Sequence, residues 1–116
     1  MPIATLLAAT RPAFLSVTLA GVMLGLCTAA TDGAFRSPLL AVATLLFALL
    51  AHAGANVIND YYDALSGCDA ANTERIAPFT GGSRFIQDGQ LSETQTAWLG
   101  YALLVTVIPA GIALVL

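Results

Sequence analysis

The chain of 116 residues contains no lysine and few charged residues of any kind. Charged residues make up 9% of the chain and hydrophobic residues 58%, whereas a soluble domain is about 25% charged and about 45–50% apolar. The formal net charge of −3 is unsuited to binding a phosphate backbone, so nucleic acid is not an expected partner. The two cysteines, Cys27 and Cys68, fit neither a zinc pattern nor a disulfide framework.

The few charges divide the chain into three long uncharged runs. Twenty residues separate Arg11 from Asp32, 23 separate Arg36 from Asp60, and 23 follow Glu93. As helices rising about 1.5 Å per residue, these runs match a hydrocarbon core of about 30 Å, and they are too long for strands. We therefore predict an all-α membrane protein with spans at about 12–31, 37–66 and 94–116 and a polar loop at about 67–93.

The first run has a competing interpretation as a cleavable signal peptide, because it ends in the small residues at 28–30. A single preceding arginine and a run longer than the usual signal core favour a span instead. Arg11, Arg75 and Arg84 lie on one side of the predicted spans and Arg36 on the other. The positive-inside rule then predicts an integral protein of the cell (inner) membrane, with the N-terminus and the polar loop cytoplasmic.

The chain ends at Leu116 inside an apolar run, without a flanking charge or aromatic anchor. We expect the 116 residues to be the N-terminal part of a larger protein and to be inactive when expressed alone.

The second predicted span ends in a stripe of polar residues. On a helix with about 100° per residue, His52, Asn56, Asn59, Asp60 and Asp63 fall within an arc of about 100°. The two carboxylates are one turn apart and repel each other unless a cation lies between them. Carboxylate and amide oxygens are ligands suited to Mg²⁺, so the stripe predicts a metal site, although a solvated helix end is the plainer alternative.

Several other residues have positions that predict a role. Gly67 is placed to end the helix, so that Asp69 projects from the following loop. His52 is typical of a hydrogen-bonded interior residue, because no second His or Cys lies at ligand spacing. The pair Gly21 and Gly25 has the small-residue spacing typical of close helix packing in membranes.

Downstream of the stripe, two arginines flank a glycine-rich turn. Arg75 and Arg84 lie on either side of Gly81-Gly82-Ser83. Guanidinium groups and turn amides of this kind suit the oxygens of a diphosphate, although such a turn alone is a weak signal.

At these residues the chain resembles the UbiA superfamily of intramembrane aromatic prenyltransferases. The stretch 56–63, followed by Gly67 and Asp69, resembles the first aspartate-rich motif of that family. The stretch 77–84 is similar to the loop of its menaquinone branch, the 1,4-dihydroxy-2-naphthoate polyprenyltransferases, and the Arg-Pro pair at 11–12 fits the same branch. The resemblance covers nearly the whole chain but only three helices of a larger bundle of about nine.

The resemblance implies Mg²⁺-dependent transfer of a prenyl group from a polyprenyl diphosphate to an aromatic acceptor such as 1,4-dihydroxy-2-naphthoate, in menaquinone biosynthesis. By the same resemblance, the catalytic residues are Asp60 and Asp63, the metal ligands Asn56, Asp60, Asp63 and Asp69, and the diphosphate-binding residues Arg75 and Arg84. The second aspartate-rich motif of the family has no counterpart in this sequence.

Other functions remain open from the residues alone. Another branch of the same family would use 4-hydroxybenzoate or a different acceptor, and a small non-catalytic membrane subunit also fits the length. A metal or proton transporter would place acidic residues at mid-membrane depth on other spans. The three uncharged runs contain none.

Overall fold

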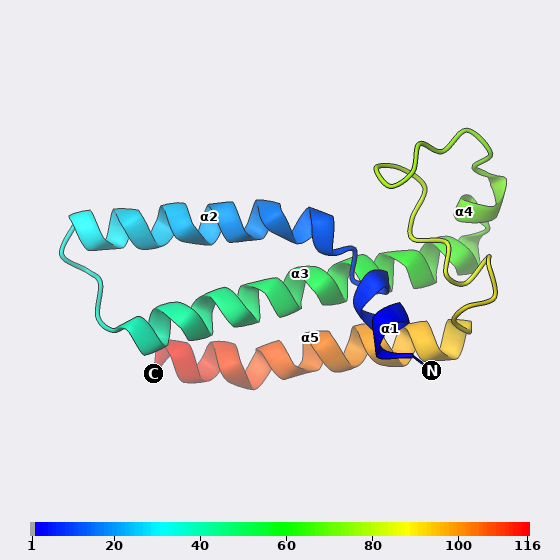
Figure 1. Cartoon of the computed structure of the whole chain (residues 1–116). Helices are drawn as coiled ribbons and strands as arrows, with labels where there is room; N and C mark the ends of the chain where they lie inside the picture. Colours follow the sequence, from blue (N-terminus) through cyan, green and yellow to red (C-terminus); the bar gives the residue numbers. More distant parts are fainter. Residues whose placement is uncertain (1) are drawn as a thin grey trace.

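The computed structural model describes residues 2–116 and shows three long helices and two short ones (Figure 1). The helices are α1 (Ile3–Ala9), α2 (Pro12–Thr31), α3 (Pro38–Ser66), α4 (Cys68–Ala71) and α5 (Glu93–Val115). No strand occurs among the described residues. The predicted all-α fold is therefore confirmed.

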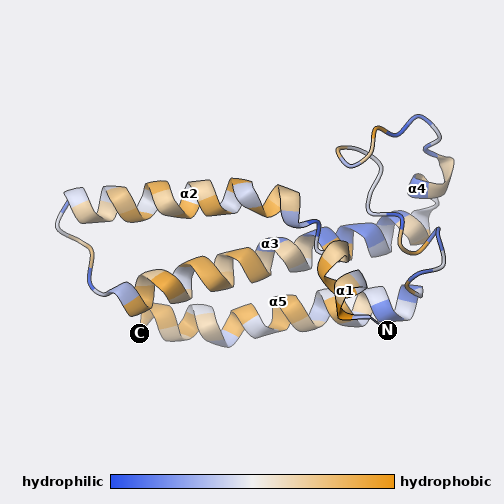
Figure 2. Cartoon of the chain, viewed as in Figure 1, coloured by the Kyte–Doolittle hydropathy of each residue, from blue (hydrophilic) through white to orange (hydrophobic). Residues whose placement is uncertain are grey.

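The helices α2, α3 and α5 are each long and apolar enough to cross a membrane. They contain 20, 29 and 23 residues, and about 20 helical residues suffice for a hydrocarbon core of about 30 Å. Figure 2 shows that apolar residues dominate these helices and that hydrophilic residues gather toward one end of the bundle. Outward-facing side chains such as Leu24 and Leu39 are 70% and 76% exposed. A surface of this kind suits lipid, and the chain is an integral membrane protein.

The central helix, α3, packs against both α5 and α2 (Figure 1). Two glycines bring α3 and α5 into close contact. A Cβ added at Gly54 would lie 2.9 Å from the Leu104 side chain, and one added at Gly100 would lie 2.6 Å from Ile58. Small residues at helix contacts allow the two backbones to approach closely.

The small-residue pair on α2 has no packing partner among the described residues. A Cβ added at Gly21 or at Gly25 would meet nothing within 4 Å in the described part of the chain. Close helix packing at this pair stays a prediction, because spacing identifies a face of small residues but not the helix that covers it.

Two hydrogen bonds connect the long helices. Thr18 on α2 and His52 on α3 share one at 2.7 Å between Oγ1 and Nδ1, and the hydroxyls of Tyr62 on α3 and Tyr101 on α5 share another at 2.8 Å. The half-buried His52 is therefore a hydrogen-bonded interior residue, as predicted.

Local signals in the sequence determine where α3 begins and ends and where α5 begins. The Ser37 side chain accepts a hydrogen bond from the Leu40 amide at 3.1 Å and caps the start of α3. Gly67, at a φ of +74°, ends α3 as predicted. Ser92 and Gln95 form a reciprocal capping box that starts α5.

The short helix α1 is an element that the charge pattern does not indicate. It stops just before Arg11, where the following proline disfavours the helical conformation and the backbone takes a φ of +56°. Ala9 is buried against α3 and the polar loop. The small apolar core at this end contains Ala9, Val57 and Leu91, with Leu6, Phe85, Leu99 and Leu103 packed around it. The N-terminal segment, the end of α3 and the polar loop thus meet at one end of the bundle.

Candidate active site

Two carboxylates from different elements converge on a glycine of the polar loop. Asp60 lies on α3 and Asp69 on α4. A Cβ added at Gly82 would lie 3.0 Å from Asp60 Oδ1 and 2.6 Å from Asp69 Oδ2. The backbone of Gly82 has a φ of +69°, which glycine adopts without steric cost. The loop therefore folds onto the two carboxylates at a position where only glycine fits.

Both carboxylates are buried, and each has one oxygen without a hydrogen-bond partner. Asp60 is 4% exposed and Asp69 is 3% exposed. The Ser83 amide donates to Asp60 Oδ2 at 3.1 Å, but Asp60 Oδ1 and Asp69 Oδ2 have no partner among the described residues. Leaving a buried polar atom unsatisfied costs about 1–3 kcal/mol, and more when the group is charged. Two unsatisfied carboxylate oxygens side by side fit a hard divalent cation.

The electrostatic surroundings of Asp69 also favour a bound cation. Burial raises the pKa of Asp69 above its ordinary value, and the nearby negative charges of Asp60 and Asp63 raise this pKa further. The positive charges of Arg84 and Arg11 act in the opposite direction. Asp69 in its ionised form is thus destabilised by its surroundings, and a bound cation would relieve this.

The other predicted ligands on α3 do not converge on Gly82, and each takes part in a hydrogen bond. The Asn59 amide donates to Asp63 Oδ2 at 2.6 Å, one helical turn away. The Asn56 amide donates to the Thr10 carbonyl at 3.0 Å, which connects α3 to the end of α1. The structure therefore brings together Asp60 and Asp69 rather than the whole predicted set. Over residues 2–116 no group of three or more His, Cys, Asp or Glu side chains is positioned to hold a metal ion.

The two predicted phosphate-binding arginines have different contacts in the polar loop. Arg84, at a φ of +62°, donates from its guanidinium to the Asp69 carbonyl at 2.9 Å. Arg75 lies against Gly81, where an added Cβ would be 2.7 Å from the Arg75 Cβ. Glycine is thus needed at two consecutive positions, 81 and 82, to let the loop pass between Arg75 and the carboxylates.

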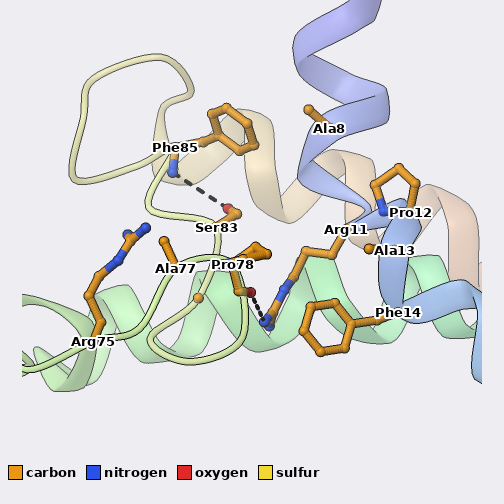
Figure 3. A pocket seen from close by; sticks show the side chains of 11 residues that line it. Ala8, Arg11, Pro12, Ala13, Phe14, Arg75, Ala77, Pro78, Ser83 and Phe85 are labelled. Atoms are coloured by element: carbon orange, nitrogen blue, oxygen red, sulfur yellow. Dashed lines mark hydrogen bonds between the residues drawn. The ribbon is translucent and has the colours of Figure 1, made fainter.

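A third arginine, Arg11, lies at the site, in the turn between α1 and α2. It lines a cavity of about 350 Å³ together with Arg75 and with Gly82 and Ser83 (Figure 3). Sequence reasoning used Arg11 only for orientation and family resemblance and did not assign it to the site. The feature of the sequence that could have pointed to Arg11 is its position directly before a proline, at the start of the first span.

The comparison with known families identifies the family but not its branch. The profile of the UbiA prenyltransferase family matches residues 14–116, which is most of the chain. The chain belongs to the UbiA prenyltransferase family. No curated protein and no solved structure matches it.

Membership of the UbiA family indicates prenyl transfer as the class of activity. It also indicates a prenyl diphosphate and an aromatic compound as the substrate classes, and these suit a polar site at the end of apolar helices. The match begins at Phe14 and therefore contains the carboxylate pair and the glycine turn, whereas Arg11 lies just before it.

Proposed function

We propose that the full-length protein transfers a prenyl group from a polyprenyl diphosphate to an aromatic acceptor and that it requires Mg²⁺. The observation that carries this proposal is the convergence of Asp60 and Asp69 on Gly82, each with a buried oxygen that lacks a partner. Family membership supplies the reaction class. The acceptor that we propose is 1,4-dihydroxy-2-naphthoate, in menaquinone biosynthesis, because the loop at 77–84 resembles that branch.

Asp60 and Asp69 are the residues that would hold Mg²⁺, with Asp63 and Asn56 on the adjoining face of α3. Bound there, the ion would neutralise the negative charge that develops on the leaving diphosphate. The Ser83 amide holds Asp60 in place by donating to its second oxygen. Asn59 orients Asp63 in the same way.

The arginines have a separate task in this proposal. Arg84 is anchored by its hydrogen bond to the Asp69 carbonyl, and its remaining donors suit phosphate oxygens. Arg75, on the other side of the glycine turn, adds a second guanidinium. Charge-assisted hydrogen bonds from arginine bind phosphate more strongly than neutral donors do. Together they would hold the diphosphate beside the carboxylates.

The location of the site suits an amphipathic substrate. The carboxylate pair belongs to α4 and to the part of α3 near it, where hydrophilic residues gather (Figure 2), and the three spans present apolar surface. A polyprenyl chain can then remain in lipid while its diphosphate reaches the polar site. We propose that this end faces the cytoplasm, because three of the four arginines lie on that side.

The test uses membranes that contain the full-length protein, a polyprenyl diphosphate and 1,4-dihydroxy-2-naphthoate, with Mg²⁺ or with EDTA. We expect product with Mg²⁺ and none with EDTA. The rate should be at least about 100-fold lower for Asp60→Asn and for Asp63→Asn, since each removes a charge at the site. Asp88→Asn is the matched control, because Asp88 is an exposed carboxylate of the same loop. Wild-type turnover in Asp60→Asn, or full activity in EDTA, would contradict the proposal.

A further inference from the structure

A cavity between the end of α3 and the start of α5 combines aromatic rings with a carboxylate. It measures about 260 Å³. One lining residue comes from α3 and the others come from the first turns of α5. They are Tyr61, Glu93, Thr94, Ala97, Trp98 and Tyr101. No basic residue belongs to this lining, and it shares no residue with the candidate active site.

The close packing of α3 on α5 forms this cavity. The two helices run in opposite directions (Figure 1), and Gly100 lies against Ile58. Three residues further along α3 is Tyr61, and three residues back along α5 is Ala97, so the tyrosine ring stands beside a residue with a very small side chain. The lining residues of α5 recur at intervals of three or four and therefore lie on one face of that helix. A larger residue at position 97 would fill the space.

Tyr62 holds two of the three aromatic walls in place. Its ring meets the Tyr61 ring edge to face, with the centroids 5.1 Å apart. Its hydroxyl shares a hydrogen bond of 2.8 Å with the Tyr101 hydroxyl. The third wall, Trp98, is 73% exposed, so most of its ring remains accessible to a ligand. Rings that are already positioned lose less freedom when a ligand binds.

The chemistry of this lining suits a cation. The face of an aromatic ring carries partial negative charge and attracts an ammonium group that lies within about 6 Å of the ring centre, and tryptophan does so most strongly. Several rings around one ammonium group form the arrangement with which proteins bind alkylammonium ligands. Glu93 adds a full negative charge, and no arginine of the lining offsets it. An anion would be repelled by this carboxylate.

The depth of the cavity indicates a lipid headgroup as the source of the ammonium group. Glu93 begins α5, and Trp98 and Tyr101 follow about 7.5 Å and about 12 Å further along the helix axis. Tryptophan and tyrosine near the end of a span lie at the level of the lipid headgroups. Hydrophilic residues gather at the same end of the bundle (Figure 2). The cavity therefore opens where phospholipid headgroups surround the protein.

We propose that this cavity binds the ammonium group of a phosphatidylethanolamine headgroup, between the rings of Tyr61, Trp98 and Tyr101 and paired with Glu93. A primary ammonium has three N–H donors, which form charge-assisted hydrogen bonds with a carboxylate. The acyl chains then lie along the apolar surface of α5, and the phosphate remains at the aqueous boundary. This site is separate from the proposed prenyl transfer, and its occupation requires no turnover.

Native mass spectrometry of the full-length protein in detergent measures the affinity for individual lipids. The two lipids compared are phosphatidylethanolamine and phosphatidylglycerol, which has no ammonium group, with the same acyl chains. We expect Glu93→Gln and Trp98→Leu each to weaken phosphatidylethanolamine binding at least about fivefold and to leave phosphatidylglycerol binding unchanged. Glu74→Gln, at an exposed acid of the polar loop, and Phe35→Leu, at an exposed ring between α2 and α3, are the matched controls and change neither affinity.

An equal loss of both lipids would show that these residues only contact the apolar part of the membrane, and it would overturn the proposal. Unchanged phosphatidylethanolamine binding in both variants would do the same. Trp98→Phe retains an aromatic face and should recover part of the affinity that Trp98→Leu loses. Should Trp98→Leu lower the melting temperature, Glu93→Gln carries the test, because Glu93 is exposed and its replacement has nearly the same size.

A further arm of the experiment distinguishes a lipid from a soluble amine. O-phosphoethanolamine has the same headgroup without acyl chains. Added at the concentration of the lipid, it should leave phosphatidylethanolamine binding unchanged, because the acyl chains contribute apolar burial along α5. Displacement of the lipid by this compound would show that the site takes soluble amines and would overturn the assignment to a lipid.

Discussion

Replacing Gly82 by alanine tests whether Asp60 and Asp69 work as a pair. The added methyl would lie 2.6 Å from Asp69 Oδ2 and 3.0 Å from Asp60 Oδ1. Ordinary contact begins at 3.4 Å, so the Asp69 carboxylate would have to retreat by roughly 0.8 Å. A misplacement of about 1 Å at a catalytic site can lower a rate by about 100-fold. We expect Gly82→Ala to lower the prenyl-transfer rate of the full-length protein by between about 10-fold and 100-fold.

The substitution also lowers stability through two separate effects. The positive φ at position 82 costs alanine about 1–2 kcal/mol, and crowding of the carboxylates adds about 1–3 kcal/mol. Gly89→Ala isolates the first effect, because Gly89 has the same φ of +69° and a Cβ there would meet nothing within 4 Å. Thermal unfolding in detergent compares the two variants, and the Mg²⁺ dependence of activity is measured in parallel.

The comparison has a clear refuting result. If Gly82→Ala loses no more stability than Gly89→Ala and responds to Mg²⁺ as the wild type does, the carboxylates do not converge on Gly82. A larger loss of stability together with a weaker response to Mg²⁺ is the result that the structure predicts.

Three further predictions concern topology, packing and pH. A cysteine introduced at Ser92 should be blocked in intact cells by a membrane-permeant thiol reagent and not by an impermeant one, and the reverse would invert the orientation. Gly100→Ala should overpack α3 on α5 and lower the free energy of unfolding by about 1–3 kcal/mol, seen as a lower melting temperature, whereas Gly111→Ala, with open space at its Cβ, should not. Without divalent cations, the raised pKa of Asp69 means that stability falls as the pH rises from 3.8 through this pKa. Asp69→Asn should remove that fall, and an unchanged pH profile would refute the assignment.

The fold was predictable because local features of the sequence determine it. Uncharged runs longer than 18 residues predict spans, and the charges at Asp32, Arg36 and Glu93 separate them. Gly67 ends α3 as predicted, because glycine adopts the left-handed conformation at a helix end without steric cost. Such signals depend only on neighbouring residues, so a single sequence is sufficient to find them.

The composition of the site was only partly predictable. Helical spacing places Asp60 and Asp63 on one face, and this holds, but the partner that the structure gives to Asp60 is Asp69. Asp63 is instead paired with Asn59, because residues four apart on a helix are neighbours. The approach of Asp69 depends on how the loop returns to α3, and periodicity carries no information about that path.

The position of Arg11 at the site was not predictable for a similar reason. Arg11 and Pro78 are far apart in the sequence, and their contact requires the turn between α1 and α2 as well as the path of the polar loop. The sequence shows an arginine before a proline, but not the loop that meets it. The same limit explains Gly21 and Gly25, whose spacing predicts packing without identifying a partner.

The two partnerless oxygens also show what the carboxylate pair is organised to do. Burying Asp60 Oδ1 and Asp69 Oδ2 without partners costs about 1–3 kcal/mol for each, and no nearby donor of the described chain offsets this. A site arranged for stability would place a hydrogen-bond donor within reach of these two oxygens. Glycine at position 82 instead keeps the space between the carboxylates free of side chains. A ligand that fills this space stabilises the folded protein in proportion to the logarithm of its concentration over its Kd. Ligand binding thus offsets the free-energy cost of burying the two oxygens without partners. Gly82 lets the loop fold onto the carboxylates and also leaves room for the ligand between them.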